Sequence, residues 1–230
     1  MPKVFIATPA FQGKVNVQYA VSLSETVNLL SSKGVKVDLK LNVGGSLLCA
    51  ERNRLTEAFM ETDCTHMLCI DSDLGWQSEA VISMLLKDED MICGCYPARS
   101  GKMFIFRPCY NEDSTLICNA EKQLIKMEYI PAGFMLIKRC VIEKMRNSFP
   151  ELYFESKNES SISSKGYCLF ETKLLNGEFW GEDYIFCSRV KQCGFDIWVD
   201  PSIQFDHDGK IGALVEALTN DPDKSAPPPV

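Results

Sequence analysis

Two aspartates stand two residues apart directly after an apolar run, in the segment HMLCIDSDLGW at 66–76. The run has the length of a buried strand, and open α/β sheets bind ligands at the carboxyl ends of such strands. Residues two apart in an extended chain project to the same side, so Asp71 and Asp73 would converge on one cation. Carboxylate oxygens suit Mg²⁺ or Mn²⁺ shared with substrate phosphates. The alternative is a plain polar turn, because Asp, Ser and Gly all favour turns.

A second acidic group, Glu182 and Asp183 in WGEDYIFCSRV, follows Gly181 at the start of a predicted helix. The helix dipole favours carboxylates at this end. One of them could act as a general base that takes the proton from an attacking hydroxyl. Adjacent helical residues point about 100° apart, so we expect only one of the two to face a site. The alternative is an ordinary helix cap with solvated carboxylates.

The third group is FDHDGK at 205–210, which follows the strand predicted to be the last in the chain. It contains His207, one of only two histidines, between two aspartates and ahead of a glycine, so we expect it in a loop. Imidazole is a suitable Mn²⁺ ligand, and His207 could complete the coordination begun by Asp73. The alternative is a solvated loop histidine. The other histidine, His66, opens a buried strand and is expected to be structural.

The chain that must position these groups alternates strands and helices in its first half. Apolar runs predict strands at 4–8, 35–43, 66–71 and 91–96, and helical spacing predicts helices at 15–32, from Ser46 to about 61, and at 79–86. Gly34 suits the end of the first helix, and Ser46 suits the N-cap of the second. Repeated units of this kind imply a largely parallel sheet with helices on both faces.

The second half is expected to add antiparallel strands. They are predicted at 115–119 and 123–130, followed by a strand at 134–139, helices at 140–147 and 183–192, and a last strand at 195–200. The serine-rich segment 156–165 predicts a mobile loop. The segment TNDPDKSAPPPV at 219–230 has little to bury and is expected to be disordered.

Composition and charge narrow the class of protein. The 230 residues are 46% hydrophobic and 24% charged, which suits one domain with an ample core. The net charge of −7 disfavours binding to extended nucleic acid. No run approaches the ~20 apolar residues of a membrane helix, and the N-terminal run is too short for a signal peptide. The 11 cysteines lack zinc-site spacing, so we expect apolar core residues in a reducing cytoplasm.

Taken in order, these motifs resemble those of the GT-A-fold glycosyltransferases, in particular the family-2-like enzymes, of which similar small members occur in large DNA viruses and phages. The resemblance runs from Lys3 to about Lys210 and rests on TPAF, ERN, DSD, PAGF, GED and DHDG. It implies one α/β nucleotide-diphospho-sugar transferase domain with a mostly parallel central sheet, flanking helices and a smaller antiparallel portion. Residues 1–217 would form this domain, with a nucleotide-binding half at 1–100, an acceptor and catalytic half at 101–217, and a disordered tail at 218–230.

The resemblance also implies roles for individual residues. Asp183 would be the catalytic base of an inverting reaction, with Glu182 as the less favoured choice. Asp73 and His207 would bind the metal directly, and Asp71 would contact the ribose or hold the metal through water. The remaining positions would border the donor or acceptor, namely Thr8, Pro9 and Ala10 beside the nucleoside, Arg52 near the base or diphosphate, Ser72 within the DSD, Gly133 and Phe134 at the sugar and acceptor pocket, and Lys210 at the diphosphate.

The implied activity is hexosyl transfer that depends on Mn²⁺ or Mg²⁺. A UDP or GDP sugar would be the donor, and a glycan, lipid or glycoprotein would be the acceptor. The sequence SRVKQCGF stands where elaborate members carry Q-x-x-R-W, which argues against processive synthesis.

Three other classes of protein share some of these features. A haloacid-dehalogenase-like phosphatase would carry its Asp-x-Asp nearer the N-terminus, with Thr or Val after it, whereas Leu74 and Gly75 follow here. A nucleotidyltransferase would have a glycine-rich loop after its first strand, and TPAFQGKVN has one glycine. The third class is a non-catalytic module that binds carbohydrate or nucleotide-sugar on the same fold.

Overall fold

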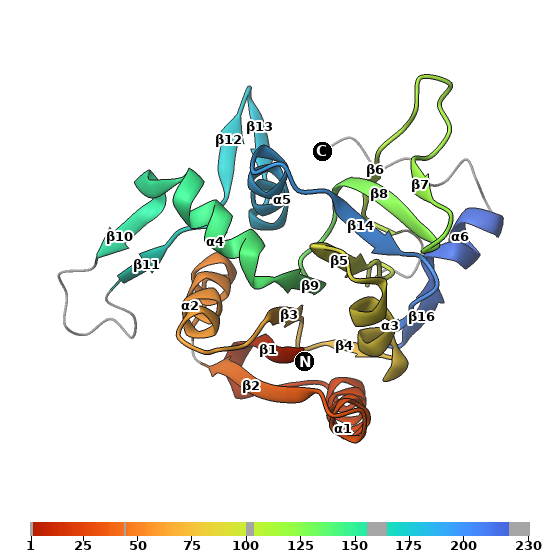
Figure 1. Cartoon of the computed structure of the whole chain (residues 1–230), viewed down its shortest axis with the longest axis horizontal. Helices are drawn as coiled ribbons and strands as arrows, with labels where there is room; N and C mark the ends of the chain where they lie inside the picture. Colours follow the sequence, from red (N-terminus) through yellow and green to blue (C-terminus); the bar gives the residue numbers. More distant parts are fainter. Residues whose placement is uncertain (1, 44, 100–103, 156–164, 221–230) are drawn as a thin grey trace.

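The computed structural model describes residues 2–43, 45–99, 104–155 and 165–220 (Figure 1). The elements of its first half are β1 (Lys3–Ala10), a 3₁₀ turn η1 (Phe11–Gly13), α1 (Val17–Ser32), β2 (Lys36–Val43), α2 (Leu48–Met60), β3 (His66–Ile70), β4 (Leu74–Trp76), α3 (Glu79–Lys87) and β5 (Met91–Gly94). These match the predicted alternation, and α1 ends just before Gly34, whose φ of 76° is the left-handed conformation that glycine tolerates. Ser46 is not the predicted cap, because α2 starts at Leu48 with Leu47 in the capping position and no side-chain cap.

The second half is richer in short strands. Its elements are β6 (Arg107–Pro108), β7 (Cys118–Asn119), β8 (Leu124–Tyr129), β9 (Phe134–Lys138), α4 (Arg139–Ser148), a 3₁₀ turn η2 (Pro150–Leu152), β10 (Tyr153–Glu155), β11 (Lys165–Tyr167), β12 (Lys173–Leu175), β13 (Glu178–Trp180), α5 (Glu182–Gln192), β14 (Ile197–Asp200), β15 (Gln204–His207), β16 (Lys210–Ala213) and α6 (Leu214–Asn220). Two strands, β15 and β16, therefore follow the one predicted to be last. The disordered tail expected at 218–230 is wrong for 218–220, which belong to α6, and 221–230 lie outside the described residues. The loop predicted at 156–165 also lies outside them, except for Lys165 at the start of β11.

The central sheet has the order β2–β1–β3–β9–β5–β14–β8–β6, and β7 also pairs with β8. Strands β2, β1, β3, β5 and β14 run in one direction, whereas β9 and β8 run in the other. The predicted α/β class, with a mostly parallel sheet and a smaller antiparallel portion, is confirmed. β9 lies between β3 and β5, where Met135 is opposite both Cys69 and Cys93. Its apolar run FMLIK suits this central place, since four of its five residues are buried.

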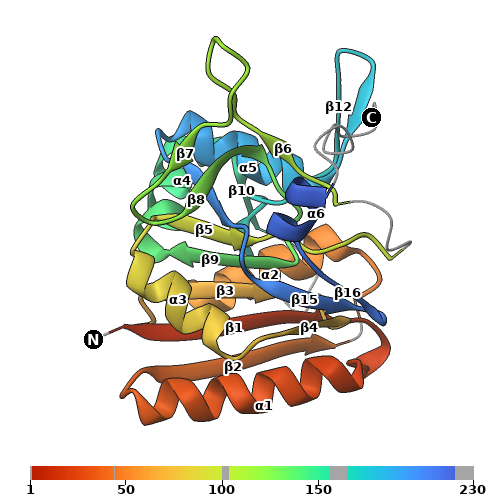
Figure 2. The same ribbon diagram turned by 90° about the vertical axis from the view of Figure 1, so that its right-hand side faces the viewer.

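Helices cover both faces of the sheet (Figures 1 and 2). On β1, Phe5 and Ala7 belong to one core cluster and Val4 and Ile6 to the other, as expected from the alternation of side chains along a strand. The first cluster contains residues of α2, α4 and α5, and the second contains residues of α1 and α3. The two clusters fix the helices against the sheet and so place the start of α5 near the ends of the parallel strands.

A small three-stranded sheet, β16–β15–β4, lies beside the end of β3. In it β4 pairs antiparallel with β15, and His207 is opposite Leu74. This pairing brings the FDHDGK segment next to the DSD segment, although more than 130 residues separate them along the chain. Within the described residues, no helix has the length and apolar character needed to cross a membrane.

Candidate active site

The DSD segment is a turn rather than an extended stretch. The backbone N–H of Leu74 bonds to the carbonyl of Asp71 at 3.3 Å, and β4 begins at once. The extended backbone expected for Asp71 and Asp73 is therefore wrong, and the convergence of their carboxylates on one cation stays a prediction. Asp71 pairs with Arg52, whereas Asp73 pairs with Arg99 and His207.

Arg52 connects the end of β3 to the start of α5. Its Nη2 donates to Oδ1 of Asp71 at 2.8 Å, its Nη1 donates to the carbonyl of Ala132 at 3.2 Å, and its Nε lies 3.5 Å from Oε1 of Glu182. The side chain is only 4% exposed. Burial lowers the pKa of the guanidinium, but the carboxylates of Asp71 and Glu182 outweigh it and the net pKa is raised. Among the described residues, the buried Nε has no hydrogen-bond partner. Arg52 thus bridges two carboxylates from distant segments.

Gly133 is packed so closely that only glycine fits. Its carbonyl accepts a hydrogen bond from the backbone N–H of Asp71 at 2.9 Å. A Cβ at this position would meet the hydroxyl of Tyr96 and, at 2.6 Å, Oδ2 of Asp71. The next residue, Phe134, is fully buried between Trp76 and Phe205, with ring centroids at 5.6 and 5.0 Å. The side chain of Phe134 is therefore part of the core and does not line the expected pocket.

Asp183 has the properties of a proton acceptor. It lies in the first turn of α5, after Gly181 in the extended capping conformation, and its Oδ1 accepts a hydrogen bond from the backbone N–H of Tyr184 at 2.8 Å. Burial, followed by the neighbouring charge of Glu182, raises the pKa of Asp183 from 3.8 to about 6. A carboxylate with such a pKa is ionised at neutral pH yet remains basic enough to accept a proton. Glu182 is instead engaged with Arg52, so the two carboxylates have different partners.

Asp73, His207 and Arg99 form the second part of the site. His207 is the last residue of β15 and only 8% exposed, so the expectation of a loop histidine is wrong. Its Nδ1 donates to the carbonyl of Pro97 at 2.7 Å, which directs Nε2 toward Oδ2 of Asp73 at 3.4 Å. The hydrogen bond with Asp73 raises the pKa of His207. Burial would raise the pKa of Asp73, but the bonds from His207 and Arg99 outweigh it and hold that pKa at about 2.

Two residues of this region were missed by sequence reasoning. Arg99 forms an ion pair with Asp73 although its side chain is 71% exposed. Tyr96 lies against Gly133 and packs edge-on against the ring of His207, with centroids 5.3 Å apart, so it connects the two parts of the site. Both belong to the segment CYPARS after β5. Position at a strand end was the only available signal, since neither residue type is distinctive there.

The other expected residues are placed less favourably. Thr8 and Ala10 are buried at the end of β1, and the hydroxyl of Thr8 is 2.6 Å from that of Tyr19, whereas Pro9 between them is half-buried. Ser72 is half-buried in the turn and Lys210 is exposed at the start of β16. The structure therefore brings together the members of the DSD, PAGF, GED and DHDG motifs, and leaves the β1 residues largely covered.

The donor set around Asp73 is chemically suited to a divalent cation. A carboxylate and an imidazole face one another there, and the cationic guanidinium of Arg99 also contacts the carboxylate. Mg²⁺ and Mn²⁺ typically use one or two protein carboxylates, with substrate phosphates and water filling the other positions, so two side chains are a sufficient protein contribution.

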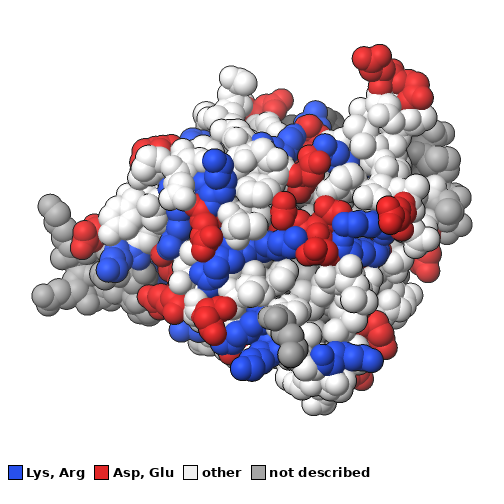
Figure 3. All heavy atoms as spheres, in the orientation of Figure 1, with Lys and Arg blue, Asp and Glu red and all other residues white. Residues whose placement is uncertain are grey.

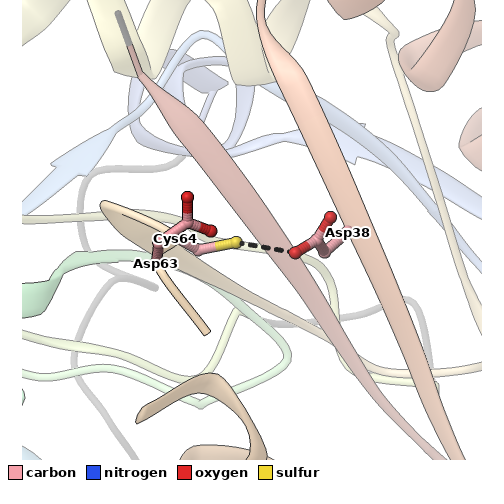
Figure 4. Close-up of side chains that lie close together, drawn as sticks. All are labelled: Asp38, Asp63 and Cys64. Atoms are coloured by element: carbon pink, nitrogen blue, oxygen red, sulfur yellow. Dashed lines mark hydrogen bonds between the residues drawn. The ribbon is translucent and has the colours of Figure 1, made fainter. Parts of the chain in front are cut away.

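In the described part of the chain, the one group of three ligand-type side chains close enough for a shared ion is Asp38, Asp63 and Cys64 (Figure 4). This group lies near the amino ends of β2 and β3, away from the DSD turn. Lys3 bonds to both of its aspartates, with 3.0 Å between Nζ and Oδ2 of Asp38. The lysine already supplies the positive charge, so this group is a structural ion-pair cluster.

No known protein-family model matches the chain, and no curated protein matches it. Solved structures do resemble it, and three glycosyltransferases are among them. The catalytic domain of Drosophila β1,4-galactosyltransferase 7 with xylobiose has a TM-score of 0.47 and 14% identity, over 90% of this chain and 71% of that one. GalNAc-T7 with UDP, GalNAc and Mn²⁺ has a TM-score of 0.47 and 11% identity, over 98% of this chain and 49% of that one. S. aureus TarS 1–349 with UDP-GlcNAc has a TM-score of 0.41 and 12% identity, over 86% of this chain and 56% of that one. All three TM-scores lie below 0.5, so the function proposed below rests on the site of this chain.

Proposed function

We propose that this chain is a GT-A-type glycosyltransferase that moves a sugar from a nucleoside-diphosphate donor to a hydroxyl acceptor. The observation that carries the proposal is the buried linkage Asp71–Arg52–Glu182. It holds the strand-end aspartate beside the helix start that bears Asp183, whose pKa is about 6. A strand-end carboxylate, a metal-type pair and a basic carboxylate in one place are the groups that this reaction needs.

In the proposed mechanism, Asp183 takes the proton from the acceptor hydroxyl as that oxygen attacks the anomeric carbon. The attack comes from the face opposite the leaving diphosphate, so the configuration inverts through an oxocarbenium-like transition state. Arg52 holds Asp71 and Glu182 in place through its ion pairs with both carboxylates. Gly133 leaves room at the backbone for the carboxylate of Asp71 and the hydroxyl of Tyr96, and so helps to position Asp71.

Asp73 and His207 would hold the divalent ion, and Asp71 would act through water or on the ribose. Bound there, Mn²⁺ or Mg²⁺ supplies Lewis-acid stabilisation of the departing diphosphate. His207 is well prepared for such a role, because its bond to the carbonyl of Pro97 leaves Nε2 directed at the Asp73 carboxylate.

The role of 1–100 as nucleotide-binding half, the UDP or GDP donor and the glycan, lipid or glycoprotein acceptor belong to the same proposal. A cytoplasmic location and the lack of a nucleic-acid partner stay predictions from the sequence.

The test is calorimetric binding of a panel of nucleoside diphosphates and nucleotide sugars, first with Mn²⁺ and then with EDTA. We expect one nucleotide to bind only with metal, and Asp73→Ala to remove this binding because it deletes a ligand. Asp63→Ala is the matched control, since it deletes an exposed carboxylate of the Lys3 cluster. Failure of every nucleotide to bind would reject the transferase and favour the non-catalytic carbohydrate-binding module.

A further inference from the structure

A cavity of about 710 Å³ lies outside the site described above. It is bounded by β6, β8, the end of α5 and the start of β14. In the sheet β8 lies between β14 and β6, and α5 packs against β8 and β14 (Figures 1 and 2). Its charged lining residues are Arg107, Lys126, Lys191, Glu128 and Asp196.

The charges in this cavity leave one cation in excess. Lys126 pairs with Asp196 at 2.6 Å, and Lys191 pairs with Glu128 at 2.7 Å, so four of the five charges cancel. The exposed Arg107 has no ion pair or side-chain hydrogen bond with any residue that the structure describes. An unpaired guanidinium in a cavity, on a protein of net charge −7, is a favourable place for an anion.

Tyr129 separates the cavity from the proposed base. Arg107 is opposite Tyr129 in the β6–β8 pairing, and its guanidinium carbon lies 5.9 Å from the centre of that ring. The ammonium of Lys191 lies 5.3 Å from the same ring. Tyr129 in turn stacks on Tyr184, with centroids 5.1 Å apart, and the backbone N–H of Tyr184 bonds to Asp183. Tyr129 and Tyr184 therefore connect the residues of the cavity to the start of α5, the helix that bears Asp183.

We propose that this cavity is an acceptor subsite for an anionic group, a carboxylate or a phosphate, carried next to the hydroxyl that receives the sugar. Arg107 binds the anion, and the ring of Tyr129, stacked on Tyr184, helps to hold the guanidinium in place. The acceptor role rests on the proposed function, whereas binding of the anion at Arg107 does not. The substrate class that follows is an anionic glycan or a phosphorylated acceptor rather than a neutral sugar.

The first experiment is an NMR titration of the arginine side-chain N–H signals, with the Arg107 signal identified by its loss in Arg107→Lys. The probes are methyl β-glucuronide, inorganic phosphate and, as the neutral match, methyl β-glucoside. We expect Arg107 to respond to one or both anions at concentrations roughly 10-fold below those that affect Arg54, which lies outside the cavity and is already paired with Glu51. A response to the glucuronide alone identifies a carboxylate, and a response to phosphate alone identifies a phosphate ester.

Equal response of Arg107 and Arg54, or equal response to the glucoside, would overturn the proposal. Donor binding with Mn²⁺ is then measured for Arg107→Ala and for the control Lys122→Ala, which removes a lysine outside this cavity. We expect both variants to bind the donor as the unmodified chain does, and Arg107→Ala alone to lose the anion. If the unmodified chain binds the donor but no anion, the subsite is rejected and the proposed transferase is kept. Anion binding at Arg107 in a chain that binds no donor rejects the proposed transferase, and with it the acceptor role of the subsite.

Discussion

At the scale of single residues, Asp183 is the group whose environment most clearly differs from that of an ordinary surface carboxylate. Its pKa of about 6 reflects burial and the charge of Glu182, and Arg52 only partly compensates for both. The same burial that makes it a base also costs stability when it ionises. The two consequences can be measured separately.

Asp183→Asn should lower kcat by roughly 10²-fold or more and leave metal-dependent donor binding unchanged, because the amide cannot accept the proton. For the unmodified chain, kcat/KM should rise with pH through about 6 and then level off, since only the carboxylate is active. A steady-state pH profile of both proteins checks this. Wild-type turnover by Asp183→Asn would remove Asp183 as the base.

The stability effect has a definite sign. The folded-state pKa of Asp183 is above its value of 3.8 in the unfolded chain, so its favourable contribution is fully present below about pH 4 and is lost as pH rises through 6. Asp183→Asn should therefore raise Tm at pH 8 by several degrees, and leave Tm almost unchanged at pH 4. Thermal unfolding at the two pH values tests this, and a lower Tm at pH 8 would contradict it.

Arg99 is a second residue whose effect can be predicted. Its guanidinium contacts the same Asp73 carboxylate that is proposed to bind the metal, so cation and arginine compete. Arg99→Ala should tighten Mn²⁺ binding in the absence of nucleotide by up to about 5-fold, a modest amount because the side chain is largely exposed. Calorimetric titration with Mn²⁺ gives the affinity. Lys122→Ala, which breaks an ion pair with Glu89 far from Asp73, should have no effect. Weaker Mn²⁺ binding by Arg99→Ala would show that Arg99 supports the metal instead of competing with it.

At the scale of elements, the site depends on how α2 is tied to the segment that precedes β12. The buried amide of Asn53 accepts from the backbone N–H of Phe170 and donates to its carbonyl, both at 2.8 Å. Phe170 stacks on Phe186 of α5 and also lies under Arg52, 6.0 Å from the guanidinium carbon to the ring centre. Asn53 thus helps to fix both Arg52 and the helix that carries Asp183.

Asn53→Ala should lower the free energy of unfolding by about 2–4 kcal/mol, because it leaves a buried N–H and a buried C=O without partners. Denaturant unfolding measures this loss. Asn111→Ala is the matched control, since Asn111 makes its side-chain hydrogen bond to Thr115 in an exposed turn. Equal losses for the two variants would mean that the Phe170 backbone finds other partners.

At the scale of the whole molecule, strands from both halves of the chain are interleaved in one sheet. β9 and β14 come from the second half, yet they flank β5 of the first half. The charged surface does not divide the halves either, because basic and acidic side chains are interspersed over the face seen in Figure 3. Residues 1–100 therefore do not form a sheet of their own, and their role as a nucleotide-binding half stays a proposal.

A fragment of residues 1–100 should fail to fold, because removing β9 leaves β3 and β5 without their shared neighbour. The whole chain should unfold in one cooperative transition. Far-UV circular dichroism and calorimetry test both statements, with residues 1–220 as the control that keeps every described strand and helix. A folded 1–100 fragment would contradict this account of the sheet.

The sequence by itself predicted five of the six α-helices and about half of the strands that the structure describes. The spacing of apolar residues, with a period of two in strands and 3.6 in helices, is a local property of the sequence, and so is a helix-ending glycine such as Gly34. The alternation of strands and helices in the first half, and α5 in the second, could therefore be predicted to within a few residues. It also singled out Asp71, Asp73, Asp183 and His207, because polar groups at strand ends and helix starts are visible without any contact information.

Only the tertiary structure decided how these residues meet. The pairing of β4 with β15 places His207 opposite Leu74, next to the DSD turn, and buries it there. Arg52 contacts Asp71, Ala132 and Glu182, which belong to three segments distant from one another in the sequence. These segments meet because β9 lies between β3 and β5 and because α5 packs over that sheet. The raised pKa of Asp183, the contact between Arg99 and Asp73 and the cavity at Arg107 depend on distances across the fold. A local pattern does not encode such distances, since they are fixed only when the two core clusters close around the sheet.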